Sequence, residues 1–136
     1  MEQTKHDIQT REEIVLLVNT FYDRVKADDT IGYIFHEIIG EDWSHHLPVM
    51  YSFWETVLFG KAGYMGNPVG KHIELDRRIP LTEQHYERWL KLWTETVDDM
   101  FAGETANEAK KKAATMLQLI SMKVNMARER GNKSVL

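Results

Sequence analysis

The chain has 136 residues, of which 43% are hydrophobic and 28% charged, and this composition predicts one globular domain over residues 1–136. The absence of cysteine excludes disulfides and thiolate metal sites. A net charge of -4 without a strongly basic face argues against nucleic-acid binding. No basic-then-apolar segment opens the chain and no apolar run approaches the ~20 residues that span a bilayer, so we expect a cytoplasmic protein without membrane contact.

Helical periodicity begins near residue 10. Thr10 and Glu13 predict a capping box, and apolar residues then recur at helical spacing, which predicts a long helix over about 10–27. Residues 28–40 are interrupted by two glycines and are expected to form one or two short helical turns and a corner.

A second helix is expected over about 42–59, where Pro48 should either bend the helix or mark its first turn. Residues 60–80 are rich in glycine and are expected to be mostly irregular, with at most one short helix near His72. Long irregular stretches inside compact domains tend to be functional, and this one also carries apolar side chains.

Two further helices complete the predicted all-α chain, since no strand pattern competes. Thr82 is expected to cap a helix over about 82–101. The last helix, over about 105–130, is expected to open with a second capping box at Thr105 and to stop before Gly131, after which the chain should be frayed.

The histidines are the main candidates for metal chemistry, but most of their spacings fail. His36 and Glu37 begin like a zinc-protease helix, but residue 40 is glycine instead of the required second histidine. A di-iron bundle needs two Glu-x-x-His pairs, and the chain offers only Asp42-x-x-His45. Spacing alone therefore identifies no multi-residue metal site.

Two histidines stay open to more than one interpretation. His46 lies on an apolar helix stripe and is either an ordinary partly buried histidine or part of a site, while His72 is either a surface loop residue or a ligand. Tyr22 and Trp89 carry polar donors into apolar helix faces, and a buried donor of this kind needs an acceptor. A bound ligand would supply one.

Four separated segments form a distinctive set, namely FYDRVKADDTIGYIF at 21–35, WSHHLPVMYSFWETVLFG at 43–60, YMGNPVGKHIEL at 64–75 and HYERWLKLW at 85–93. Together these segments resemble the truncated haemoglobins of the third group, in the order typical of that family. This resemblance implies a shortened globin fold in which two helices cross over two others around haem b and its iron.

The resemblance also implies roles for individual residues. His72 matches the proximal histidine that binds the iron, which leaves the opposite position open to small ligands. Tyr22 and Trp89 match the distal donors that hydrogen-bond a bound ligand such as dioxygen, and would stabilise its negative charge. His46 matches the histidine at the entrance to the distal side.

Other residues are expected to surround the haem. Lys71, Arg77 and Arg78 flank His72 and either pair with haem propionates or belong to a solvated basic loop. The residues expected to line the cofactor are Phe35, Met50, Phe53, Trp54 and Trp93.

The function implied by the resemblance is chemistry on diatomic ligands instead of bulk transport. The candidate reactions are nitric-oxide dioxygenation to nitrate and peroxide cleavage, with dioxygen, nitric oxide, carbon monoxide or peroxide as small ligands and an unidentified reductase as electron donor. Reversible ligand storage or sensing is the alternative within the family. The alternative outside it is a cofactor-free helical module whose aromatic pocket binds an apolar ligand or a partner helix.

Overall fold

The structure is a computed structural model that describes residues 5–64 and 66–134, with side chains described as far as Gly131. Over these residues it contains helices and connecting segments without a strand. None of the described helices is long and apolar enough to cross a membrane. The helices are α1 (Arg11–Lys26), α2 (Gly32–Ile39), α3 (His46–Phe59), α4 (Pro68–Arg78), α5 (Glu83–Met100) and α6 (Glu104–Ser134).

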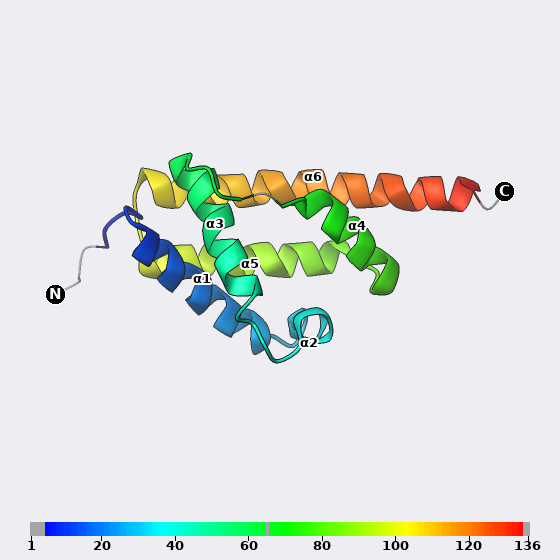
Figure 1. Cartoon of the computed structure of the whole chain (residues 1–136), viewed down its shortest axis with the longest axis horizontal. Helices are drawn as coiled ribbons and strands as arrows, with labels where there is room; N and C mark the ends of the chain where they lie inside the picture. Colours follow the sequence, from blue (N-terminus) through cyan, green and yellow to red (C-terminus); the bar gives the residue numbers. More distant parts are fainter. Residues whose placement is uncertain (1–4, 65, 135–136) are drawn as a thin grey trace.

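Two pairs of helices form the body of the fold (Figure 1). Helices α5 and α6 run antiparallel along the long axis, and α1 and α3 cross each other while packing against this pair. The short helix α2 follows α1 at one edge, and α4 lies against the second half of α6. This arrangement confirms the predicted all-α class and the crossing of two helices over two others.

The core lies where α1, α3, α5 and α6 meet. Its largest fully buried side chains are aromatic, namely Phe21, Trp54 and Trp93, and they interlock with aliphatic residues of α1 and α6. Burial of apolar surface is the main favourable term in folding, so this core stabilises the fold against which the shorter helices pack.

Local capping accounts for the starts of α1 and α5. Thr10 and Glu13 form the predicted capping box, in which the Glu13 amide donates to Thr10 Oγ1 at 3.2 Å. Thr82 caps α5 as predicted, and the His85 side chain completes a reciprocal pair with the Thr82 amide. Pro48 lies in the first turn of α3, where its missing N–H costs nothing.

Helix α4 is longer than the sequence predicts. The segment expected to be mostly irregular contains an 11-residue helix. Asn67 caps it by accepting from the Gly70 amide at 3.1 Å, and Pro68 stands at the start of the helix, where its fixed φ favours helical geometry. A Cβ at Gly70 would lie 2.4 Å from Asn67 Nδ2, so this glycine makes room for the cap instead of breaking the helix.

The predicted capping box at Thr105 is wrong. Helix α6 begins at Glu104, and its first amides are capped from the far end of the chain by Asp7, which accepts from Thr105 N at 2.9 Å and Ala106 N at 2.8 Å. Gly103 has a φ of 144°, and a Cβ there would lie 2.4 Å from Asp7 Cγ. The glycine therefore lets the N-terminal segment approach.

Two other boundaries differ from the prediction. Helix α6 continues through Gly131 to Ser134 instead of stopping before the glycine, because one exposed glycine costs only about 1 kcal/mol in a helix that is already propagating. The last two residues of the predicted frayed end, 135–136, lie outside the described residues. Trp43, expected inside the second helix, precedes α3 and is buried.

Candidate functional site

An aromatic cluster forms where α1, α2 and the start of α3 converge. It consists of Tyr22, Phe35, Trp43 and His46, and Tyr22 lies at its centre. The Tyr22 ring lies 5.9 Å from Phe35, 5.4 Å from Trp43 and 5.5 Å from His46, measured between ring centroids. The structure thus brings three predicted site residues together, and it adds Trp43.

The polar atoms of the aromatic cluster have no partners within the described chain. Tyr22 is only 4% exposed, its hydroxyl forms no hydrogen bond to a described residue, and burial raises its pKa, so the phenol stays protonated and can donate. His46 Nε2 is buried and also lacks a partner. Burial, together with the positive charge of Lys71 and the proximity of His45, lowers the pKa of His46 and favours a neutral ring.

A stack of three tryptophans supports the aromatic cluster. The Trp93 ring lies 4.4 Å from Trp54 and 5.9 Å from Trp89, with nearly parallel planes. Phe21, which precedes Tyr22 in the chain and contacts its ring, also touches Trp89 edge to face at 5.1 Å. Phe21 therefore connects the tryptophan stack to the aromatic cluster. Trp93 donates its indole N–H to Ala109 O at 3.1 Å, whereas Trp89, which is half-buried, forms no hydrogen bond to a described residue.

The apolar residues predicted to line a cofactor lie in or beside the same core. Phe53 and Trp54 are buried, and their rings meet at 5.2 Å. Met50, one helical turn after His46, is partly buried and packs against this core together with Phe35. The predicted wall is therefore continuous with the hydrophobic core, which gives it rigid support.

His72 lies on α4, away from the aromatic cluster in sequence but on a helix that packs, like α3, against α6. Its Nδ1 lies 2.6 Å from Pro68 O, so the ring donates its Nδ1–H to that carbonyl and leaves the Nε2 lone pair free. Burial lowers the pKa of His72, only partly opposed by the Pro68 contact, and keeps the ring neutral. A neutral imidazole that is oriented by a hydrogen bond from its other ring nitrogen is suited to bind a metal.

The basic side chains near His72 are exposed. Lys71 and Arg77 form no ion pair with another described residue, and Arg78 is also exposed. Exposed cationic side chains at these positions beside His72 are accessible to an anionic group of a ligand.

The sequence analysis missed two residues that shape this site. Trp43 stacks on Phe35 with ring centroids 6.1 Å apart and closes one side of the aromatic cluster. Asn67 starts the helix that presents His72. The Asn67-Pro68 pair, a cap followed by proline at the first helical position, is a sequence pattern that predicts such a start.

Comparison with known proteins defines the class. Residues 6–125 match the family described as bacterial-like globin. The match covers most of the chain, and the six helices of the described residues lie wholly or largely within it. The fold is the crossed helical arrangement described above. The chain belongs to the bacterial-like globin family.

Individual relatives place it more narrowly. The chain is 33% identical over 106 residues to the group 3 truncated hemoglobin ctb of Campylobacter jejuni, and the match covers 76% of this chain and 81% of the relative. The crystal structure of the group III truncated hemoglobin from Campylobacter jejuni superposes with a TM-score of 0.77 at 30% identity, covering 91% of this chain and 95% of that one. The resemblance to truncated haemoglobins of the third group is thereby confirmed.

Proposed function

We propose that His72 Nε2 would be the protein ligand that holds the iron of haem b. The observation that carries this proposal is the contact of His72 Nδ1 with Pro68 O at 2.6 Å, which fixes the tautomer and leaves Nε2 available. Membership of the globin family supports the same assignment. We also propose that Lys71 and Arg77, exposed beside His72 and without ion-pair partners among the described residues, pair with the haem propionates.

The aromatic cluster would line the ligand-binding side of such a cofactor. A haem so bound would supply an iron with one open coordination position for dioxygen, nitric oxide or carbon monoxide. Tyr22 and Trp89 would each donate a hydrogen bond to a ligand held there, because neither donor is used within the described chain. The neutral His46 would stand at the entrance, while Met50, Phe53 and Trp54 exclude water.

Donors aimed at a ligand that gains negative charge favour reaction over rapid release. We therefore propose conversion of nitric oxide and dioxygen to nitrate, or peroxide cleavage, as the activity, with reversible storage as the alternative. Formation of nitrate from these two gases consumes one electron, and cleavage of peroxide to water consumes two electrons and two protons, so a reductase must act with the chain in either case. No covalent step requires a nucleophile from the protein.

The decisive test is an absorption spectrum of the chain reconstituted with haemin, recorded in the ferric, dithionite-reduced and carbon-monoxide forms. We expect one intense Soret band per chain that shifts with carbon monoxide, and its loss or alteration in His72→Ala. His36→Ala is the matched control, because His36 is an exposed histidine whose side chain forms a hydrogen bond with the Lys26 carbonyl. That variant should retain the wild-type spectrum.

The opposite outcomes are equally clear. A chain without a stoichiometric Soret band would refute haem binding and favour a cofactor-free helical module. A band that survives unchanged in His72→Ala would show that another residue binds the iron.

A further inference from the structure

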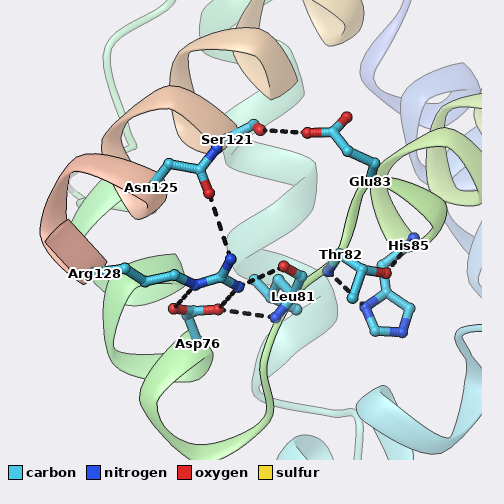
Figure 2. Close-up of polar contacts among 8 residues, drawn as sticks. All are labelled: Asp76, Leu81, Thr82, Glu83, His85, Ser121, Asn125 and Arg128. Atoms are coloured by element: carbon cyan, nitrogen blue, oxygen red, sulfur yellow. Dashed lines mark hydrogen bonds and ion pairs between the residues drawn. The ribbon is translucent and has the colours of Figure 1, made fainter. Parts of the chain in front are cut away.

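The end of α4 is tied to α6 by a polar network that the proposed chemistry does not use (Figure 2). Asp76 lies on α4, and its side chain is only 8% exposed. Arg128, on α6, donates from Nε to Asp76 Oδ2 at 2.8 Å and from Nη2 to Asp76 Oδ1. This ion pair is bidentate, so it restricts the rotation and translation of α4 relative to α6 more than a single contact would.

The same two residues also hold the connection that follows α4. Arg128 Nη2 donates to Leu81 O at 2.6 Å, and the Leu81 amide donates to Asp76 Oδ1 at 2.8 Å. Figure 2 shows the Arg128 guanidinium above the Asp76 carboxylate and the Leu81 backbone beside it. Asp76 therefore joins α4, the connection to α5, and α6 at one point.

Asp76 stands one helical turn after His72, and residues four apart lie on the same face of a helix. The other end of α4 is fixed by the Asn67 cap, and His72 is bound to Pro68 O. The imidazole is thus held between a capped first turn and an anchored last turn. Any rotation or axial shift of α4 would carry the His72 ring with it.

We infer that Asp76 and Arg128 are positioning residues for the axial ligand, which set the orientation of the His72 imidazole by fixing α4 on α6. This inference rests on the proposed function, because it assigns His72 to the haem iron. The pair acts through helix placement and touches neither ligand nor cofactor. Its loss should therefore alter the iron–histidine bond without abolishing haem binding.

A matched ion pair elsewhere separates positioning from general stabilisation. Asp28 has a side chain that is 5% exposed, accepts a hydrogen bond from Arg88 Nε at 2.7 Å, and forms an ion pair with Arg88 Nη2 at 2.6 Å. This pair joins the α1–α2 connection to α5 and includes no residue of α4. The Asp28 and Asp76 carboxylates also accept hydrogen bonds from backbone amides, so removal of either charge should lower the free energy of unfolding by a comparable amount.

The experiment compares Asp76→Asn, Arg128→Lys and Asp28→Asn with the wild type, each reconstituted with haemin. The first measurement is the iron–histidine stretching band in the resonance Raman spectrum of the ferrous, ligand-free form. The second is the rate of haem transfer to apomyoglobin. We expect a shifted and broadened band in Asp76→Asn, and haem transfer accelerated by about tenfold, the lower end of the range for residues that orient metal ligands.

The other two variants sharpen the result. Arg128→Lys keeps the positive charge but loses the bidentate geometry, so it should shift the iron–histidine band less than Asp76→Asn does. This variant also keeps the test decisive if Asp76→Asn does not fold. Asp28→Asn should lower stability and leave the band unchanged. A wild-type band in folded Asp76→Asn or, where that variant does not fold, in Arg128→Lys, would overturn the inference, as would an equal shift in Asp28→Asn. A wild-type chain that binds no haemin would instead refute the proposed function itself.

Discussion

The aromatic cluster and helix α4 are built on opposite principles. In the aromatic cluster, Tyr22 and His46 present polar atoms that no described residue satisfies. At α4, three polar side chains are engaged: Asn67 caps the helix, His72 is bound to a carbonyl, and Asp76 is paired with Arg128. The aromatic cluster leaves its polar atoms available to a ligand, while α4 uses these three side chains to fix the helix in place.

This difference matches what each side of a haem must do. A ligand-binding side needs donors that are available and already in place, because a donor that must first break a protein hydrogen bond loses most of its net gain. A metal-binding side needs its ligand held in one tautomer and one orientation. The contrast thus supports the proposed assignment of the two regions independently of the family match.

The largest expected effect concerns the support beneath the aromatic cluster. Trp93 is fully buried and stacked between Trp54 and Trp89, so Trp93→Ala should lower the free energy of unfolding by about 3–5 kcal/mol in urea titrations. Trp93→Phe is the control, since it keeps a ring and loses mainly the bond to Ala109 O. If the two variants were equally stable, the aromatic cluster would not depend on this stack.

A smaller effect is expected from removal of the Tyr22 hydroxyl, one of the donors that has no partner among the described residues. Tyr22→Phe should speed dioxygen dissociation about tenfold, because a hydrogen bond to a partly charged ligand contributes about 1.5 kcal/mol. Folding stability should not fall, since the Tyr22 hydroxyl has no partner among the described residues. The rate is measured by stopped-flow displacement of dioxygen with carbon monoxide.

Tyr51→Phe is the matched control for this experiment. The Tyr51 hydroxyl donates to Asn19 Oδ1, which joins α3 to α1, so its removal should reduce stability and leave dioxygen release unchanged. Equal dissociation rates in the wild type and Tyr22→Phe would show that the Tyr22 hydroxyl does not reach the ligand.

A third variant lies remote from both regions. Asp7→Ala removes the cap on α6 and should lower the free energy of unfolding by about 1 kcal/mol, with the haem spectrum unchanged. Burial alone would raise the pKa of Asp7, but the amides of Thr105, Ala106 and Ile8 outweigh it and lower the pKa below its ordinary value of 3.8.

The sign of the pH dependence follows from that shift. A carboxyl group with a lowered pKa in the folded state contributes stability above its unfolded pKa and loses this contribution as the pH falls through the folded pKa. The difference between wild type and Asp7→Ala should therefore be constant near neutral pH and shrink below pH 3.8. Asp23→Ala, which removes an exposed acid on α1, should leave the free energy of unfolding nearly unchanged at neutral pH.

These residues also show what a sequence can and cannot predict. The Thr10 and Thr82 caps are predictable because each operates within four residues. The Asp7 cap joins residues 98 and 99 positions apart, so no local pattern contains it, and a plausible local capping box at Thr105 takes its place in the prediction. The length of α4 is underestimated because the glycine content of the segment outweighs the Asn67 cap.

The site divides in the same way. Apolar stripes and the family resemblance are enough to place Tyr22, His46 and Trp89 on inward helix faces. Neither indicates that the Tyr22 hydroxyl and His46 Nε2 lack partners among the described residues, because satisfaction of a polar atom depends on all surrounding elements. The Asp76 and Arg128 pairing spans 52 positions, and each residue alone resembles an ordinary surface charge.

The smallest expected effect has the opposite sign. His46 Nε2 is buried without a partner among the described residues, and replacement of an unsatisfied polar group by an apolar one of similar size is neutral or stabilising. His46→Leu should therefore raise the free energy of unfolding of the haem-free chain by about 0.5 kcal/mol, whereas His45→Leu, at an exposed position, should not. A loss of stability in His46→Leu would show that the ring has a structural partner, and a gain would mean that the histidine is maintained for its effect on ligands at a cost to the fold.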